Sequence, residues 1–172
     1  NKDLSKEAWP FFKSGNLVIA GIECVALRVS FTGDLGWELY CEEHDQLAPY
    51  EVLIKSASQI GGGPVGSRAL MSLRLEKGYG SWGREYSPEY WPHEVGLERL
   101  ISNKPYFINK GRVEDVLSMP AREKLVLLKL NQNDVLKSNA DALGGEPIFK
   151  DGKGVGRVTS GGYGYSVDMS LA

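Results

Sequence analysis

Two segments of alternating apolar character, separated by Thr32-Gly33-Asp34, constrain the fold of this chain more than any other feature. Residues 22–31 and 36–41 are rich in β-branched, aromatic and leucine side chains. Such segments on either side of a glycine-containing turn are typical of a β-hairpin. We therefore predict a pair of antiparallel strands here.

The second predicted strand carries a carboxylate beside an aromatic ring. Side chains alternate across a strand, so Glu38 and Tyr40 should share one face, opposite Trp37 and Leu39. An ionised carboxylate has two acceptor oxygens and matches two adjacent N–H donors, such as the amidine-like edge of a pterin. Glutamate is mostly exposed in folded proteins, so an ordinary solvent-facing residue explains Glu38 at least as well from this segment alone.

A short helix is predicted from residue 67 to residue 77, where apolar residues recur at helical spacing. Ser67 can cap its start, and Gly78 favours the left-handed conformation that ends a helix. Arg68 falls in the first turn, where a cation opposes the helix dipole. We expect a ligand carboxylate or a structural acid to compensate it.

Together these segments resemble the folate-binding aminomethyltransferase family, which includes the glycine-cleavage T-protein. The resemblance continues through 73–85, 92–97, 107–111 and 156–163, and so spans most of the chain. The central block is similar to the carboxy-terminal part of dimethylglycine and sarcosine dehydrogenases, where this module follows a flavin domain. One such motif would be weak evidence, but several motifs in the same order are strong evidence for this family.

The resemblance implies folate contacts at the matching positions. Glu38 matches a glutamate that binds the pterin, and Leu39 and Tyr40 complete that contact strand. Phe31 stands where dimethylglycine dehydrogenases have a folate-contacting tyrosine, so a ring contact could survive without the hydroxyl.

The resemblance also implies two arginine positions and an acid outside this sequence. Arg68 matches an arginine that T-proteins use on the folate, and Arg99 falls near a second folate-contacting tyrosine. The family's catalytic aspartate comes from a segment upstream of residue 1, so we expect no catalytic residue in this chain. Neither end of the sequence resembles a natural terminus, and we expect a piece of a longer protein.

By this resemblance, the function is that of the tetrahydrofolate-binding part of a flavin-dependent dehydrogenase or oxidase of N-methyl amines. FAD on a separate domain would oxidise dimethylglycine or sarcosine to an iminium, and the one-carbon unit would pass to tetrahydrofolate as methylene-tetrahydrofolate. The isolated piece would be inactive. A stand-alone glycine-cleavage aminomethyltransferase and a non-catalytic folate-binding relative are the alternatives. Lys77-Gly78-Tyr79 has no cysteine, which argues against the iron–sulfur-assembly branch of the family.

Composition favours small molecules as partners, and the resemblance implies an upstream flavin domain of the same polypeptide as a further partner. The chain has 172 residues, 42% of them apolar, which is enough to form a hydrophobic core. Its net charge of −2 does not favour binding to nucleic acid. No apolar run approaches the roughly 20 residues needed to cross a bilayer, so we expect no membrane partner. We expect a cytoplasmic location, or the mitochondrial matrix if the source is eukaryotic.

Cysteine and histidine usage predicts no metal site. Cys24 and Cys41 form no Cys-x-x-Cys pair, and we interpret both as buried free thiols, with a disulfide open if their strands pair. His44 and His93 are isolated, and neither is assigned to catalysis.

The predicted fold class is α+β, with a change of pattern near residues 104–123. We predict a partial folate-binding domain over 1–109 and a connecting helix plus a small, truncated β-barrel over 110–172. Besides the elements above, the patterns predict helices over 45–60 and 110–119, strands over 123–130, 146–149, 154–160 and 166–172, and a turn at Asp151-Gly152.

Two glycine clusters invite nucleotide-site interpretations that their context does not favour. Gly61-Gly62-Gly63-Pro64 lacks the Gly-Lys-Ser/Thr ending of a phosphate loop and is better explained as a helix-ending loop. The segment 161–165 lacks the strand–turn–helix setting of a dinucleotide fingerprint and predicts a β-turn. An aromatic group could form either a wall around a ligand or an interface between domains: Tyr79, Trp82, Tyr86, Tyr90 and Trp91.

Overall fold

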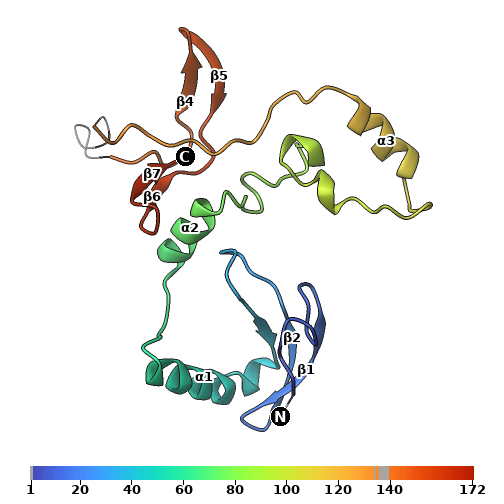
Figure 1. Ribbon diagram of the computed structural model, residues 1–172, viewed down its shortest axis with the longest axis vertical. Coiled ribbons are helices and arrows are strands. Elements are labelled where there is room, and N and C mark those ends of the chain that lie inside the picture. The colour runs from blue at the N-terminus through green and yellow to red at the C-terminus, as the bar shows by residue number, and fades with distance from the viewer. Residues whose placement is uncertain (1, 134, 136–139) are drawn as a thin grey trace. The chain divides into compact units, whose positions relative to one another are not determined.

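The computed structural model describes residues 2–133, 135 and 140–172 (Figure 1). The chain divides into two compact units, Asn1–Met71 and Ser72–Ala172. Both units combine helices with short antiparallel strands, which confirms the predicted α+β class. The domain boundary that we place after residue 109 stays a prediction.

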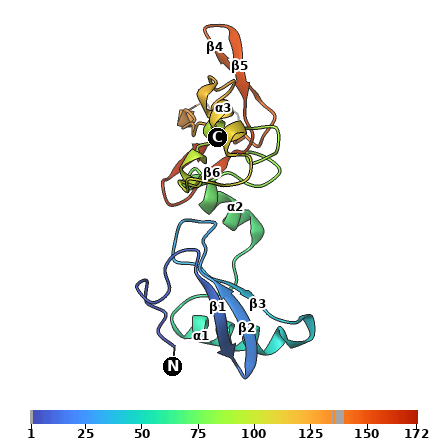
Figure 2. The ribbon, with the colours of Figure 1, turned by 90° about the vertical axis from the view of Figure 1, so that its right-hand side faces the viewer.

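The first unit contains a three-stranded antiparallel sheet in the order β1-β2-β3 (Figure 2). Its strands are β1 (Ser14–Ile19), β2 (Ile22–Leu27) and β3 (Glu38–Tyr40). Ala20 and Gly21 join the first two strands with φ of 53° and 82°, as a tight hairpin turn requires. The sequence pattern did not predict β1, because a glycine and an asparagine interrupt its apolar run.

The predicted hairpin of β2 and β3 is confirmed, but its connection is longer than a tight turn. Residues 28–37 join the two strands, so the strands predicted over 22–31 and 36–41 are shorter than predicted and cover only Ile22–Leu27 and Glu38–Tyr40. Arg28 itself still continues the antiparallel pairing of β1 with β2. Its backbone N–H donates to the Lys13 carbonyl (3.0 Å), and its guanidinium donates to the Trp9 carbonyl (2.6 Å).

Trp9 anchors the packing of this unit. It is 2% exposed, and its indole N–H donates to the Lys13 carbonyl at 2.9 Å. Its ring meets the Trp37 ring edge-on, with centroids 5.3 Å apart. On β2, Cys24 and Ala26 point to the buried face while Glu23 and Val25 are exposed, which is the alternation expected of a half-buried strand.

Helix α1 (Leu47–Gln59) packs beside β1, and it confirms the predicted helix around 45–60 (Figure 2). Gly61 follows it with φ of 79°. The N–H of Gly62 donates back to the Ala57 carbonyl at 2.8 Å. The glycine cluster is therefore a helix-ending loop, as predicted.

Helix α2 (Ser67–Glu76) confirms the predicted short helix, but not its start. The Leu70 N–H donates to the Gly66 carbonyl (3.1 Å), which places Gly66 at the N-cap. The predicted cap at Ser67 is therefore wrong, because Ser67 already lies within the helix.

Helix α2 ends where Gly78 predicts. Gly78 has φ of 65°, in the left-handed region. The N–H groups of Gly78 and Tyr79 donate to the carbonyls of Leu75 (2.9 Å) and Arg74 (3.1 Å). This pair of bonds defines a Schellman motif, which satisfies carbonyls that the helix end would otherwise leave unpaired.

The middle of the second unit consists of short helices. Two turns of 3₁₀ helix, η2 (Pro92–Glu94) and η3 (Glu98–Leu100), precede α3 (Lys110–Ser118). Helix α3 confirms the predicted connecting helix, and Pro120 follows its end, as a residue that cannot continue a helix would.

The last part of the chain forms two hairpins. The first joins β4 (Pro147–Lys150) to β5 (Lys153–Arg157) through Asp151 and Gly152, both with positive φ (52° and 75°), which confirms the predicted turn. The second hairpin pairs the short strands β6 (Gly162–Gly164) and β7 (Met169–Leu171).

Four predictions in this part are corrected. Residues 123–130 form no named strand. Their last part pairs with the end of the chain, because the N–H groups of Leu128 and Leu130 donate to the carbonyls of Ala172 (2.7 Å) and Ser170 (3.0 Å), whereas the Leu125 N–H donates to the Glu94 carbonyl. The strand predicted over 154–160 ends at Arg157. The predicted turn at 161–165 contains β6 instead, paired with β7 in place of a longer strand over 166–172.

Candidate functional site

Strand β3 presents the carboxylate that the sequence singles out. Glu38 is exposed and lies opposite Leu27 in the register of the sheet. The Tyr40 hydroxyl donates a hydrogen bond to the Glu38 carboxylate, so the two side chains share a face as predicted. This hydrogen bond and the adjacent negative charge raise the pKa of Tyr40, because the phenolate could no longer donate.

This pair is suited to a flat, donor-rich ligand. The Glu38 carboxylate keeps acceptor capacity beyond the one bond from Tyr40, since two carboxylate oxygens offer about four lone pairs. The Tyr40 ring is 55% exposed and offers an apolar face beside these acceptors.

The other predicted folate contacts of the first unit are Leu39, Phe31 and Arg68, and they differ in position and in exposure. Leu39 is partly buried on the opposite face, paired with Ala26, so its backbone is the part nearest the Glu38 face. Phe31 lies in the connection before β3 and is 38% exposed. Arg68 is exposed in the first turn of α2, and within the described part of the chain it takes part in no ion pair. The acid that we expected beside it is therefore not found among these residues.

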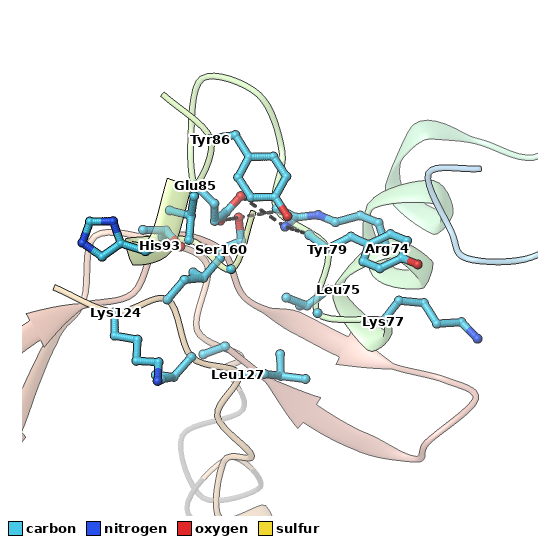
Figure 3. A pocket seen from close by; sticks show the side chains of 18 of the residues that line it. Arg74, Leu75, Lys77, Tyr79, Glu85, Tyr86, His93, Lys124, Leu127 and Ser160 are labelled. Atoms are coloured by element: carbon cyan, nitrogen blue, oxygen red, sulfur yellow. Dashed lines mark hydrogen bonds and ion pairs between the residues drawn. The ribbon is translucent and has the colours of Figure 1, made fainter. Parts of the chain in front are cut away.

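Arg99, the sixth predicted contact, belongs to the second unit. It is exposed in η3 and lines a cavity of about 300 Å³ within that unit (Figure 3). Further cationic side chains on this cavity are Lys77 and Lys124. These three cations outnumber the acids of the lining, Glu85 and Glu98, so the wall favours an anion.

A buried polar network borders the same cavity. The guanidinium of Arg74 donates to the Glu85 carboxylate (3.3 Å) and to the Ser160 hydroxyl (2.6 Å), and Ser160 donates to Glu85 (2.6 Å). Figure 3 shows these three side chains meeting. Arg74 and Glu85 are only 2% and 4% exposed, so each depends on the other for charge compensation.

The environment of Glu85 keeps it ionised. Burial alone would raise the pKa of Glu85, but hydrogen bonds from Ser160 and from the Ser81 N–H, together with the Arg74 charge, outweigh burial and hold the pKa below its usual range. The Glu85 carboxylate already accepts hydrogen bonds from these partners, so it is not available as a catalytic base. We therefore assign the network a structural role rather than catalysis.

A second buried carboxylate lies in η2. Glu94 is 1% exposed and accepts hydrogen bonds from Arg122 through its guanidinium (2.7 and 2.9 Å) and backbone N–H (3.0 Å), and from the Trp91 N–H (2.8 Å). These bonds, led by the Arg122 side chain, hold the pKa of Glu94 well below its usual range. The pair ties η2 to the segment after α3.

Sequence analysis missed these two buried acids and their arginine partners. The available signal was the position of Arg74, which interrupts the apolar stripe of α2 between Leu73 and Leu75. A charge at a core position requires a partner, but the sequence alone does not say which acid provides it.

The predicted aromatic group separates into different environments. Tyr79 and Tyr86 line the cavity of the second unit, whereas Trp82 is 81% exposed. Tyr90 accepts a hydrogen bond from Arg157 at 2.6 Å, and the Trp91 ring lies 5.9 Å from the Arg112 guanidinium. The group is thus partly a ligand-accessible wall and partly structural.

Among the residues that the structure describes, no cluster of three or more His, Cys, Asp or Glu side chains is arranged to hold a metal ion. No helix formed by the described residues has the length and apolar character to span a membrane.

The chain matches two family models that follow each other along the sequence. The GCVT N-terminal domain matches residues 1–104, and the glycine cleavage T-protein C-terminal barrel domain matches residues 124–172. The chain therefore belongs to the glycine-cleavage T-protein family, as its motifs predict.

Individual relatives come from two kinds of enzyme. The chain is 37% identical to human mitochondrial dimethylglycine dehydrogenase, over 100% of this chain and 20% of that protein. It is 32% identical to human mitochondrial sarcosine dehydrogenase, over 99% of this chain and 18% of that protein. It is 31% identical to an aminomethyltransferase of Thermoanaerobacter pseudethanolicus, over 92% of this chain and 42% of that protein. The chain thus spans about a fifth of the length of the dehydrogenases it matches.

Proposed function

We propose that this chain is the tetrahydrofolate-binding part of a flavin-dependent N-methyl amine dehydrogenase or oxidase. The observation that carries the proposal is the exposed Glu38 carboxylate with Tyr40 on the same face of β3, in a chain that aligns over its whole length with a dimethylglycine dehydrogenase. Membership of the T-protein family supports folate as the ligand.

The residues of the first unit divide the binding task. Glu38 accepts hydrogen bonds from the N–H edge of the pterin, and the Tyr40 bond holds the carboxylate in position. Phe31 adds a ring contact, and Arg68 favours the anionic glutamate end of the folate. We assign Arg99, on the cavity of the second unit, the weakest support in this set, because its match to the family is only approximate.

The chemistry of the whole protein lies partly outside this chain. Oxidation of dimethylglycine or sarcosine to an iminium belongs to a FAD domain elsewhere, and bound tetrahydrofolate supplies the amine nucleophile that takes the one-carbon unit as methylene-tetrahydrofolate. The contribution of this chain is to hold the folate in place, which replaces a bimolecular encounter and limits loss of formaldehyde. The proton-accepting aspartate is expected from an upstream segment.

A stand-alone aminomethyltransferase is the second candidate. The match to a bacterial aminomethyltransferase favours it, because this chain covers a larger share of that protein than of the dehydrogenases. An FAD-binding segment encoded upstream in the same reading frame would separate the two. The mitochondrial names of the dehydrogenase relatives support a matrix location if the source is eukaryotic.

The test is equilibrium binding of reduced folate to the chain under anaerobic conditions. Glu38→Gln should weaken binding by about 1–3 kcal/mol, or about 5- to 150-fold in Kd, because a charged acceptor is replaced by a neutral one. The matched control is Glu51→Gln, which neutralises an exposed acid on α1 and should leave Kd unchanged.

Circular dichroism establishes that each variant is folded. Unchanged affinity in folded Glu38→Gln would remove this residue from the site. If the wild-type chain does not bind, the titration is repeated on the full-length protein, and absence of binding there would overturn the folate proposal.

A further inference from the structure

Of the two cysteines of the first unit, Cys24 lies on β2 and Cys41 directly follows the last residue of the neighbouring strand β3. Val25 pairs with Tyr40 and Ala26 pairs with Leu39 in the antiparallel register of β2 and β3. Continuing that register by one residue places Cys24 opposite Cys41. Directly opposed Cα atoms on antiparallel strands lie about 4.5–5.5 Å apart, within the range of about 4.4–6.8 Å that a disulfide spans.

The environment of the two thiols fits a reacting pair. Both are free, and both line one hollow of about 570 Å³ on the sheet. Cys24 is 2% exposed, whereas Cys41 is partly exposed and can meet a reagent first. Burial raises the pKa of the Cys24 thiol, and the charge and hydrogen bonding of the neighbouring Cys41 thiol add to this effect, so Cys41 is better suited to react first and Cys24 to react second.

We propose that Cys24 and Cys41 form a reversible disulfide that crosslinks β2 to β3. The oxidant is a small-molecule disulfide of the glutathione type. The Cys41 thiolate attacks one of its sulfurs, which breaks the oxidant's S–S bond and releases one thiolate. The Cys24 thiolate then attacks the Cys41 sulfur of this mixed disulfide and displaces the second thiolate. The two cysteines lose two protons and two electrons, and the oxidant is reduced to two thiols.

The crosslink acts on the strand that carries Glu38. Cys41 directly follows Tyr40, the last residue of β3, and β3 is only three residues long. A covalent bond at this end holds β3 against β2 and limits its local opening. Any consequence for folate rests on the proposed function of Glu38, whereas the disulfide itself does not.

The first experiment equilibrates the whole chain with defined ratios of oxidised and reduced glutathione, followed by acid quenching, alkylation and intact-mass analysis. The wild type should lose both alkylation sites and two hydrogen atoms, without a glutathione adduct, and digestion should give one linked pair of peptides. Cys24→Ala should stop at a glutathione adduct on Cys41, and Cys41→Ala should stay reduced because its remaining cysteine is buried. A wild type that stays reduced, stops at the mixed disulfide or forms a dimer would overturn the proposal.

The second experiment compares the oxidised and reduced chain. Hydrogen exchange of the β3 amides should slow several-fold on oxidation, while the β4–β5 hairpin of the other unit serves as the unchanged internal control. Equal exchange at β3 would overturn the restraining role. A folate titration on both forms tests the coupling: a several-fold change in Kd supports it, and equal Kd with the disulfide formed overturns the coupling alone.

Discussion

The edge of the first unit and the interior of the second use glutamate in opposite ways. Glu38 on β3 is exposed and accepts one side-chain hydrogen bond, from Tyr40. Glu85 and Glu94 are 4% and 1% exposed, and each meets an arginine. A carboxylate whose oxygens are already paired holds the structure together, whereas one with free acceptor capacity and solvent access is available to a ligand. The contrast therefore assigns stability to one set of acids and binding to the other.

The largest effect expected from this contrast is that of Glu85→Ala. It leaves the Arg74 charge buried without its partner, which should lower the free energy of unfolding by about 3–5 kcal/mol. Ser160→Ala, which removes one neutral member of the same network, should cost about 1–3 kcal/mol. Urea denaturation followed by circular dichroism measures both. A loss for Glu85→Ala no larger than that for Ser160→Ala would show that water replaces the carboxylate.

The next effect is the dependence of stability on acid. The pKa of Glu94 is lowered in the folded chain, so its stabilisation is complete above the ordinary glutamate pKa of about 4.3 and is lost as the pH falls through the folded value. Glu94→Gln should therefore be less stable than the wild type at neutral pH, with a difference that shrinks progressively below about pH 4. The neutral-pH loss should be smaller than for Glu85→Ala, because the Arg122 side chain is 60% exposed and can be hydrated.

Unfolding curves of the wild type and Glu94→Gln, recorded at several pH values, test whether their difference in stability shrinks as the pH falls. Parallel stability profiles from neutral to acidic pH would contradict a lowered pKa at Glu94.

A smaller loss of stability is expected at the end of α2, where the backbone conformation of a glycine, and not a charge, ends the helix. Gly78→Ala forces a side chain into the left-handed region at the end of α2 and should cost about 1–2 kcal/mol. Gly111→Ala is the matched control, since it lies inside α3 with open space around the added Cβ and should stabilise by about 0.5–1 kcal/mol. Denaturation midpoints of the two variants should move in opposite directions. Equal shifts would contradict the conformational explanation.

Local sequence signals predicted those features whose cause is local. The left-handed glycine after α2, the Asp151-Gly152 turn and the shared face of Glu38 and Tyr40 follow from φ preferences and strand alternation, and all three are confirmed.

Features set by distant partners could not be predicted in this way. β2 ends at Leu27, and Arg28, the last residue that continues its pairing, has its partners Lys13 and Trp9 in the amino-terminal segment. Residues 123–130 have strand-like composition, but their backbone pairs with the end of the chain from Leu128 onward, while the Leu125 N–H donates to the distant Glu94 carbonyl. The network around Arg74 likewise depends on residues far along the chain. The predicted folate contacts stay predictions, because they rest on matching positions in a family.

The smallest expected change in stability is also the one that separates the two kinds of glutamate most sharply. Glu38→Gln keeps the shape of the side chain and removes a charge that solvent already surrounds, so the free energy of unfolding should change by less than about 0.5 kcal/mol. Under the proposed function, the same variant loses folate affinity, so binding and stability should respond independently. Parallel urea denaturation and folate titration on one preparation measure both quantities. A destabilisation comparable to that of Glu85→Ala would show that β3 depends on this carboxylate for its structure, and any loss of binding would then reflect a disturbed strand rather than a missing ligand contact.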